Sequence, residues 1–260
     1  MKVVILCGGK GTRLREETEY RPKPMVPIGN RPILWHIMKT YAHYGHSEFV
    51  LCLGYKGEMI KEFFRNYHWN TCDVTVSLGR KAAPKFHHGH GEEDWSVTLA
   101  DTGENTMTAH RVKQIQRYIP KGEPFMLTYG DGLATIDLPA LVKAHRKSGK
   151  VCTLSAVHPA GRFGALRIDD DGRIKTFSEK PQYEDAQVNG GYMVCEHRMF
   201  DYLPDDPSVM LEQKPMEQLV RDNQLNAYHH EGFWQPMDTY QETQHLNQLW
   251  AAGNAPWKVW

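Results

Sequence analysis

The chain has 260 residues, which is enough to bury a large core in one domain or in two closely packed lobes. Lysine plus arginine equals aspartate plus glutamate at 31 each, so the chain lacks the excess positive charge that draws a protein onto nucleic acid or an anionic membrane. No run of about 18 apolar residues is present, which argues against a membrane-spanning helix.

Apolar runs of strand length alternate with amphipathic runs of helical length through the first 157 residues. This alternation predicts βαβ units around a mostly parallel sheet. A helix is expected after Pro32, where apolar side chains recur at helical spacing, and another is expected over residues 57–67. The expected strands are residues 2–7, 48–53, 124–129 and 151–157.

The pattern changes from residue 162 onward. Residues 165–168 and 173–177 flank an Asp-Gly turn, which predicts an antiparallel hairpin and therefore a mixed sheet. Residues 84–94 show no periodicity and are expected to form a loop. Without a repeat or an obvious linker, we expect one Rossmann-like α/β domain over residues 1–260, with a first part at 1–157 and a smaller second part at 158–260.

The five cysteines are an odd number, are widely spaced and form no C-x-x-C pair. Three of them, Cys7, Cys52 and Cys152, lie in expected strands, where a free cysteine usually behaves as a small core residue. The N-terminal apolar run shows no charged leader and no small-residue cleavage site. We therefore expect a cytoplasmic protein with reduced thiols, and the spacing disfavours a zinc-binding or catalytic role for them.

A glycine-rich loop, GGKGTRL at residues 8–14, follows the first expected strand. Glycines at a strand-to-helix junction let backbone N–H groups approach phosphate oxygens closely. The spacing fits neither a Walker A loop nor the dinucleotide pattern G-x-G-x-x-G. The loop carries Arg13, and Lys23 follows between two prolines, so two cations are available for a triphosphate. The alternative is a tight turn beside two solvated charges.

Five separated motifs resemble those of the sugar-1-phosphate nucleotidyltransferase family. They are GGKGTRL with a following PKP (residues 8–24), YGDG (129–132), EKP (179–181), NGG (189–191) and GFWQPMDT (232–239). The resemblance implies the nucleotide-diphospho-sugar transferase fold. It also implies Mg²⁺-dependent transfer of a nucleoside monophosphate from an NTP to a sugar 1-phosphate, with release of pyrophosphate.

Further motifs resemble the cytidylyl branch of that family most closely. They are GYKG at residues 54–57, GRFGAL at 161–166 and the tryptophan-rich C-terminus. This implies CTP and glucose 1-phosphate as substrates, and supply of deoxysugars for surface polysaccharide. A uridylyl- or thymidylyltransferase is an alternative, as is a non-catalytic regulatory subunit that binds nucleotide sugars. The family also implies a homo-oligomer, and we expect no nucleic-acid or membrane partner.

Two aspartates are candidate metal ligands. Asp131 follows an apolar strand, at the carboxyl edge where open α/β sheets bind their ligands. Asp238 precedes a helical pattern, so an N-cap is the alternative there. Mg²⁺ is commonly held by one or two carboxylates and by substrate oxygens. The resemblance implies that Asp131 and Asp238 hold Mg²⁺, the expected cofactor.

The resemblance also assigns residues to the reaction and to the nucleotide. Arg13, Lys23 and Asp131 are implied to be catalytic, through positioning and charge neutralisation. Thr106 and Arg111 are implied to lie near the base, where a hydroxyl or a backbone carbonyl would distinguish cytosine from uracil. The implied nucleotide-binding residues are Leu6, Cys7, Gly8, Gly9, Lys10, Gly11, Thr12, Arg13, Lys23, Gly103, Thr106, Arg111 and Gly130.

For the sugar phosphate, the resemblance implies Gly164, Glu179, Lys180 and Asn189. An isolated Glu-Lys-Pro is otherwise typical of a turn. A second candidate site is a transition-metal site of histidines and carboxylates, for which a solvated loop is the alternative. Its residues are His87, His88, His90, Glu92, Glu93 and Asp94.

Overall fold

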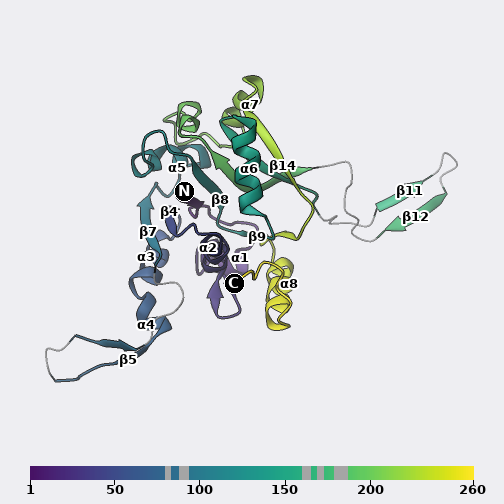
Figure 1. Ribbon diagram of the computed structural model, residues 1–260. Coiled ribbons are helices and arrows are strands. Elements are labelled where there is room, and N and C mark those ends of the chain that lie inside the picture. The colour runs from purple at the N-terminus through teal and green to yellow at the C-terminus, as the bar shows by residue number, and fades with distance from the viewer. Residues whose placement is uncertain (80–82, 88–93, 160–164, 169–172, 179–186) are drawn as a thin grey trace.

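A computed structural model describes residues 1–79, 83–87, 94–159, 165–168, 173–178 and 187–260 (Figure 1). Its centre is a seven-stranded sheet in the order β14-β10-β13-β8-β1-β4-β7. Of these seven strands, β13 alone runs antiparallel to its neighbours, so the expected mixed, mostly parallel sheet is confirmed. The strands are β1 (Val3–Leu6), β4 (Glu48–Leu53), β7 (Ser96–Asp101), β8 (Phe125–Tyr129), β10 (Cys152–Val157), β13 (Val188–Cys195) and β14 (Leu225–His230).

Helices cover both faces of this sheet (Figure 1). The α-helices are α1 (Arg15–Thr18), α2 (Ile33–His43), α3 (Gly57–Arg65), α4 (Tyr67–Thr71), α5 (Thr108–Gln114), α6 (Leu138–Ser148), α7 (Lys214–Arg221) and α8 (Tyr240–Ala251). Three 3-10 helices are η1 (Lys23–Met25), η2 (Ile115–Tyr118) and η3 (His197–Tyr202). In the described ranges, no helix is long and apolar enough to cross a membrane.

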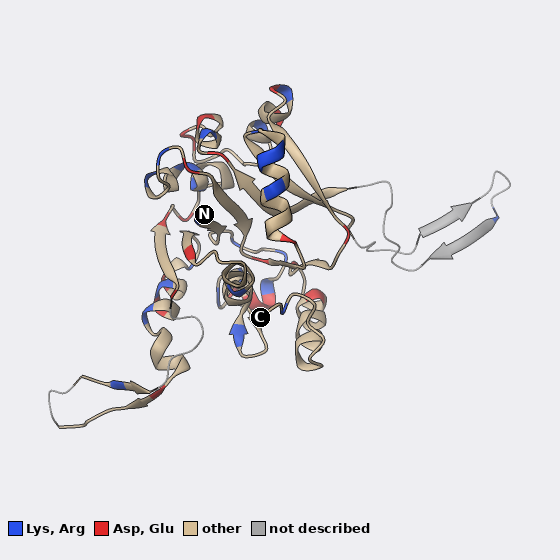
Figure 2. Cartoon of the chain, viewed as in Figure 1, with Lys and Arg blue, Asp and Glu red and all other residues tan. Residues whose placement is uncertain are grey.

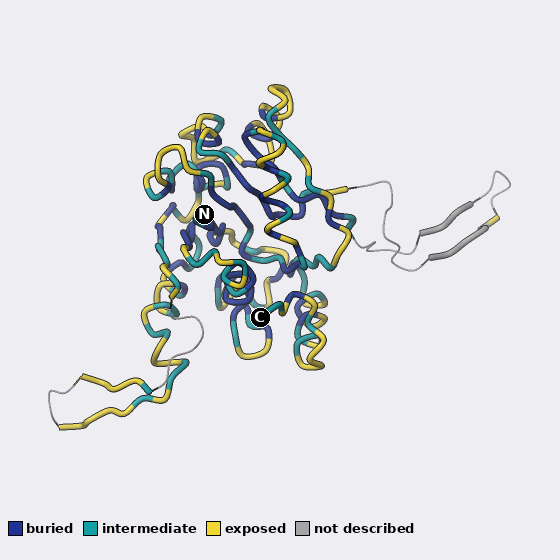
Figure 3. Tube along the Cα trace, in the orientation of Figure 1, coloured by how far each residue is buried: buried dark blue, intermediate teal, exposed yellow. Residues whose placement is uncertain are grey.

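Four two-stranded sheets complete the described structure. They pair β2 (Pro27–Ile28) with β3 (Arg31–Pro32), β5 (Asp73–Thr75) with β6 (Lys85–His87), β9 (Gly132–Ala134) with β15 (Trp234–Pro236), and β11 (Ala165–Ile168) with β12 (Ile174–Ser178). The β11–β12 pair is antiparallel and confirms the expected hairpin. The β5–β6 pair extends away from the central sheet, and its described residues are mostly exposed (Figures 1 and 3).

The core explains why the first strands have continuous apolar sequences. Successive side chains of a strand point to opposite faces of the sheet. Val3 and Ile5 pack in one buried cluster, which includes α2, and Val4 and Leu6 pack in a second cluster, which includes α5. Because both faces are covered by protein, every position of β1 must be apolar. Acidic and basic residues are interspersed over the body of the molecule (Figure 2), consistent with the balanced net charge.

Two expectations are corrected. The helix expected over residues 57–67 ends at Arg65, and α4 begins at Tyr67. Asn66 has a φ of −97° and a ψ of 15°, outside the helical range, which separates the two helices. The loop expected over residues 84–94 contains β6, because residues 85–87 find backbone partners in β5. Residues 88–93 of that segment lie outside the described residues.

Trp257 fastens the C-terminal segment to the core. Its side chain is fully buried, and its ring stacks on Phe233 with the centroids 5.7 Å apart. Trp257 Nε1 also donates a hydrogen bond to His36 Nδ1 of α2, at 3.4 Å. This packing therefore fixes the chain just before residues 234–239, which carry Asp238.

Replacing Trp257 with alanine is expected to lower the free energy of unfolding by about 3–5 kcal/mol, because it leaves a large cavity in the core. Urea denaturation monitored by circular dichroism measures the loss. Tyr20→Ala is the control, since Tyr20 is an aromatic residue that is 69% exposed and its removal should cost about 1 kcal/mol or less. Equal losses in the two variants would contradict this account of the C-terminal segment.

Candidate active site

The candidate site lies at the carboxyl edge of the parallel strands β4, β1 and β8. Leu6, the last residue of β1, is in register with Cys52 of β4 and Tyr129 of β8. The loops that follow these strands therefore leave the sheet side by side. Backbone hydrogen bonds continue the ladder, since the N–H of Cys7 donates to Cys52 O and the N–H of Gly130 donates to Leu6 O, both at 3.0 Å.

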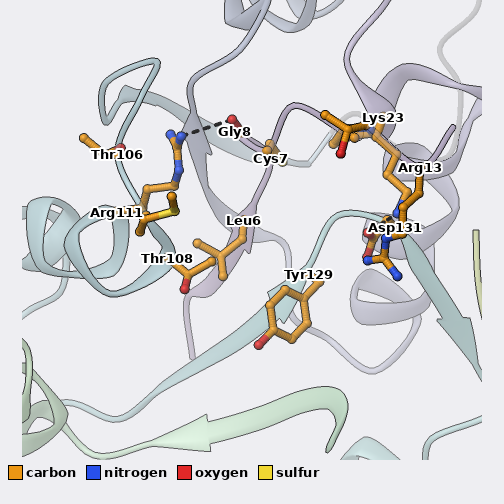
Figure 4. A pocket seen from close by; sticks show the side chains of 15 residues that line it. Leu6, Cys7, Gly8, Arg13, Lys23, Thr106, Thr108, Arg111, Tyr129 and Asp131 are labelled. Atoms are coloured by element: carbon orange, nitrogen blue, oxygen red, sulfur yellow. Dashed lines mark hydrogen bonds and ion pairs between the residues drawn. The ribbon is translucent and has the colours of Figure 1, made fainter. Parts of the chain in front are cut away.

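A pocket opens at this edge (Figure 4). The glycine-rich loop forms one wall, the start of α5 forms another, and the acidic residue after β8 lies at one end. The lining residues are Leu6, Cys7, Gly8, Gly9, Gly11, Thr12, Arg13, Lys23, Pro24, Thr106, Met107, Thr108, Arg111, Tyr129 and Asp131.

Lys23 joins the two aspartates that were expected to hold a metal. Its Nζ donates to Asp131 Oδ2 at 2.7 Å and to Asp238 Oδ1 at 2.5 Å. Arg13 NH1 donates to Asp238 Oδ2 at 2.5 Å. Burial alone lowers the pKa of Lys23, but the charges and hydrogen bonds of the two aspartates outweigh it and raise that pKa above its ordinary value. Lys23 is therefore a fixed ammonium group between two carboxylates.

A small antiparallel sheet positions Asp238 at the site. Pro236 of β15 is in register with Gly132 of β9, and the N–H of Met237 donates to Asp131 O at 2.8 Å. The two acidic residues thus lie on adjacent strands or their extensions, although they are far apart in the sequence. Two neighbouring carboxylates repel each other because both are negatively charged, and the ammonium of Lys23 offsets that repulsion.

The N-cap of α8 is Thr239, so the alternative reading of Asp238 as an N-cap is wrong. Thr239 Oγ1 accepts from the N–H of Glu242, and Glu242 Oε2 accepts from the N–H of Thr239, which makes a capping box. Glu242 Oε2 also accepts from the N–H of Asp238. Because Thr239 and Glu242 cap the start of α8, the Asp238 carboxylate is not needed there, and it contacts Lys23 and Arg13 instead.

Arg111 is a buried guanidinium that underlies the glycine-rich loop. Its NH2 donates to Gly8 O at 3.0 Å, and its NH1 donates to Leu53 O at 3.1 Å and Gly103 O at 2.8 Å. A Cβ on Gly8 would lie 2.1 Å from NH1, so a larger residue there would displace the guanidinium of Arg111. Burial lowers the pKa of Arg111 from its ordinary value. Because its N–H groups are committed to backbone carbonyls, Arg111 fixes the shape of the pocket wall.

Thr106 lies in the same wall. Its Oγ1 donates to Thr102 O at 2.7 Å and to Gly103 O at 3.0 Å. Gly103 has a φ of +91°, a conformation that glycine adopts readily, and this turn brings its carbonyl within reach of Thr106. A hydroxyl has one hydrogen. Since that hydrogen is directed at the backbone, Thr106 Oγ1 can only accept a hydrogen bond from a ligand.

The structure brings most of the expected nucleotide residues together, and a few lie apart from the pocket lining. Lys10 is exposed, and Gly130 is buried beside the lining, where a Cβ would lie 3.0 Å from Leu6 O. Gly103 contributes its carbonyl to Arg111 and Thr106. Burial raises the pKa of Cys7 well above its ordinary value, as expected for a core thiol.

The expected sugar-phosphate residues are only partly described. Asn189 is the second residue of β13, and its Oδ1 accepts from the N–H of Gly191 at 2.9 Å. Gly164, Glu179 and Lys180 lie outside the described residues.

The histidine-rich segment is also only partly described. His87 lies in β6, where its Nε2 is 2.8 Å from Thr75 Oγ1. His88, His90, Glu92 and Glu93 lie outside the described residues. Among the side chains that the structure does describe, no group of three or more histidines, cysteines or acidic residues is placed to hold a metal.

Sequence reasoning missed several residues at the pocket. Pro24, Met107, Thr108 and Tyr129 line it, and Glu212 contacts two of them. Tyr129 stands directly before the Gly-Asp-Gly that carries Asp131, so its position along β8 was the available signal. Nothing in the sequence around Glu212 pointed to the site.

The chain is similar to known proteins over its full length. It matches the nucleotidyl transferase family over residues 2–239. It is 46% identical over 260 residues to "Glucose-1-phosphate cytidylyltransferase" of Salmonella typhi, covering 100% of both chains. It is 45% identical over 260 residues to "Probable glucose-1-phosphate cytidylyltransferase" of Bacillus subtilis (strain 168), again covering 100% of both chains.

A solved structure supports the fold. The crystal structure of a putative glucose-1-phosphate thymidylyltransferase from Bacillus anthracis superposes with a TM-score of 0.69 at 17% identity, covering 96% of this chain and 94% of that one. The fold, the motifs at the carboxyl edge and the full-length relatives agree. The chain belongs to the nucleotidyl transferase family.

Proposed function

We propose that this chain is a glucose-1-phosphate cytidylyltransferase, which transfers a cytidylyl group from CTP to α-D-glucose 1-phosphate and gives CDP-glucose and pyrophosphate. The full-length relatives of that name support the choice of substrates. The observation that carries the chemistry is the meeting of Arg13, Lys23, Asp131 and Asp238 beside the glycine-rich loop. A nucleotide sensor would need no such set of opposed charges.

Mg²⁺ is the proposed cofactor, held by Asp131 and Asp238. The fit is chemical, since both residues offer carboxylate oxygens, the ligands that Mg²⁺ prefers. Asp131 lines the pocket, and Lys23 joins it to Asp238. When bound, the ion neutralises charge on the reacting phosphates.

The reaction requires positioning more than proton transfer. An oxygen of the sugar phosphate forms a bond to the α-phosphorus as the bond from that phosphorus to the bridging oxygen breaks, and pyrophosphate leaves with the electron pair. A phosphate monoester is largely a dianion near neutral pH, so it attacks without a general base. Lys23 offsets the negative charge near the α-phosphate, and Arg13 binds the leaving pyrophosphate through its planar guanidinium group.

The two cations differ in how firmly they are held. The Arg13 side chain is 68% exposed, so its ion pair with Asp238 is screened by water and exchanges readily. The Lys23 side chain is 9% exposed and contacts both carboxylates. Arg13 therefore exchanges Asp238 for phosphate oxygens when the triphosphate arrives, whereas Lys23 stays in place.

The pocket wall around Thr106 suits cytosine. It offers Thr106 Oγ1 as an acceptor only, beside the carbonyls of Gly103 and Glu104. Cytosine presents an amino donor at the position where uracil and thymine present a carbonyl oxygen. An acceptor-only wall pairs with the amino group and opposes the carbonyl.

The remaining proposals concern the sugar site, the assembly and the location. Gly164, Glu179, Lys180 and Asn189 are proposed to bind the sugar phosphate, within the part at residues 158–260. A homo-oligomer is proposed because the region of α4 and the β5–β6 pair exposes large apolar side chains. They are Trp69, Val76, Leu78 and Phe86. A cytoplasmic location is proposed from the five free cysteines.

Turnover with glucose 1-phosphate is expected to favour CTP over UTP and dTTP by at least about 100-fold in kcat/KM, because the wrong base places a carbonyl oxygen against the acceptors of Thr106, Gly103 and Glu104. Pyrophosphate release from a panel of the four ribonucleotides and dTTP measures this preference. Thr106→Val should reduce the preference for CTP about tenfold. Thr98→Val, on strand β7, is the control and should leave that preference unchanged. Equal use of UTP would favour a uridylyltransferase, and binding without turnover would favour a sensor.

Asp131→Asn and Asp238→Asn are each expected to lower kcat by about 100-fold or more, because each removes charge that supports the transition state. Asp73→Asn changes an exposed aspartate on β5 and should leave kcat unchanged. Circular dichroism spectra of the three variants establish that the fold is intact. Near-normal turnover in either site variant would rule out the proposed metal pair.

Lys23→Met is expected to tighten the binding of Mn²⁺ to the nucleotide-free protein by about tenfold, although it lowers turnover. The reason is that Lys23 Nζ occupies the space between the two carboxylates and competes with a divalent ion for them. Electron paramagnetic resonance of free Mn²⁺ measures the affinity. The double variant Lys23→Met with Asp131→Asn should lose the gain, and an unchanged affinity in Lys23→Met would refute the competition.

A further inference from the structure

The GYKG motif at residues 54–57 connects β4 to α3, and its four residues, all of them described, lie outside the pocket lining. The motif contacts the segment that contains the glycine-rich loop, residues 8–19, at both of its ends. The backbone N–H of Tyr55 donates to Gly8 O at 3.2 Å, and the hydroxyl of Tyr55 donates to Thr18 O at 3.0 Å. One residue therefore holds the start and the end of this segment together.

We infer that Tyr55 and Thr18 are positioning residues for the triphosphate of CTP, and that they act by fixing the turn that carries Arg13. This inference rests on the proposed function, in which Arg13 binds the leaving pyrophosphate. Tyr55 and Thr18 both lie outside the pocket lining, so they act through other residues. Tyr55 anchors Thr18, and Thr18 holds the turn at residues 11–14.

The first step is the turn itself. The N–H of Leu14 donates to Gly11 O at 2.9 Å, so residues 11–14 form a turn with Thr12 and Arg13 at its centre. Gly11 has a φ of +61°, which glycine adopts without strain. Gly11, Thr12 and Arg13 line the pocket. The place from which the Arg13 side chain starts therefore depends on how firmly this turn is held.

The second step is that the Thr18 side chain holds both ends of the turn. Its Oγ1 donates to Leu14 O at 2.8 Å and to Gly11 O at 3.0 Å, so one hydrogen is shared between the two carbonyls. The Thr18 methyl group also lies against Gly11, where a Cβ would be 2.7 Å from Thr18 Cγ2. Because Thr18 is only 4% exposed, water competes little for these hydrogen bonds.

The third step is that Thr18 needs support from outside its own helix. Helix α1 has four residues, too few to be stable in isolation. The last carbonyls of a helix have no partner within it. The GYKG motif supplies those partners, since the Tyr55 hydroxyl donates to Thr18 O and Lys56 Nζ donates to Glu19 O. The motif thus caps the end of α1 from a different part of the chain and keeps Thr18 in place.

The fourth step is that Tyr55 is itself held by the central sheet. It follows Leu53, the last residue of β4, by two positions. The N–H of Gly57 donates to Gly54 O at 2.9 Å, which closes a turn around Tyr55. The ammonium of Lys56 lies 5.3 Å from the centroid of the Tyr55 ring. The Tyr55 hydroxyl therefore has a defined position relative to the sheet.

The consequence concerns the cost of ordering the loop. The Arg13 side chain is 68% exposed and its ion pair with Asp238 is screened by water, so the backbone turn determines where its guanidinium can reach. Without the contacts of Thr18 or Tyr55, the turn at residues 11–14 must be ordered when a triphosphate binds. A nucleotide that lacks the departing phosphates should be affected much less, and so should glucose 1-phosphate.

Thr18→Val removes the hydroxyl and nearly keeps the shape of the side chain. It is expected to weaken CTP binding about tenfold, the effect of losing one well-placed hydrogen bond, and to change CMP binding less than about twofold. Isothermal titration calorimetry measures both affinities. KM for glucose 1-phosphate should change less than about twofold. Thr18→Ser retains the hydroxyl and should restore most of the affinity for CTP.

Thr40→Val is the matched control for Thr18→Val. Thr40 is also buried on a helix, and its Oγ1 donates to the carbonyl four residues before it, that of His36. This variant should leave the affinities for CTP and CMP unchanged. Thermal unfolding of each variant checks that the fold is retained. Equal losses of CTP and CMP affinity in Thr18→Val would show general loosening and would overturn the positioning role.

The link between the two residues is tested with Tyr55→Phe, which removes the hydroxyl that binds Thr18 O and keeps the ring. Alone, it should weaken CTP binding about fivefold, and in the Thr18→Val background it should add less than about twofold, because both changes act on the same turn. Tyr20→Phe is the control, since Tyr20 is 69% exposed and lies two residues after Thr18. Additive effects, or an unchanged CTP affinity in Thr18→Val, would overturn the inference alone. Failure of the wild-type protein to turn over CTP with glucose 1-phosphate would overturn the proposed function together with it.

Discussion

The arrangement of the site depends on the ammonium of Lys23, which is shared by two carboxylates in a largely buried position. Without it, the buried carboxylate of Asp238 and the half-buried carboxylate of Asp131 would be adjacent anions that repel each other. The ion network also determines which elements must meet. The helical turn η1 brings Lys23, the end of β8 brings Asp131, and the β9–β15 pair brings Asp238.

A second buried cation gives the glycine-rich loop its shape. Arg111 donates to carbonyls after β1, at the end of β4 and in the turn at residues 103–104, so one side chain joins three loops. These contacts explain glycine at positions 8 and 54, where a Cβ would lie 2.1 Å and 2.3 Å from the guanidinium. A loop held this way would need little reorganisation on binding the triphosphate proposed for it.

The sequence predicts those features that depend on local pattern. Strands β1, β4, β8 and β10 were expected within a residue of their bounds, since strands covered on both faces are continuously apolar. It did not predict β7, β13 or β14, and the insertion of β13 between β8 and β10 depends on pairing between distant segments. The cap of α8 could have been predicted, because Thr239 and Glu242 have capping-box spacing, but the residue considered for that role was Asp238. The contacts of Glu212 could not have been predicted, since they form only when the segment before α7 packs on α5.

The same contacts bear on whether residues 1–157 and 158–260 are separate units. Asp238 and Gly191 come from the second part. Asp238 contacts Lys23, and Gly191 packs against the ring of Tyr129, and both of these partners are in the first part. Strand β13 also pairs with β8, so the central sheet itself contains both parts. A cut near residue 157 would leave Lys23 and Asp131 without the second carboxylate and would expose the edge of β8. Arg13, Lys23, Asp131 and Asp238 therefore meet only when the whole sheet forms, so residues 1–157 and 158–260 are not separate folding units.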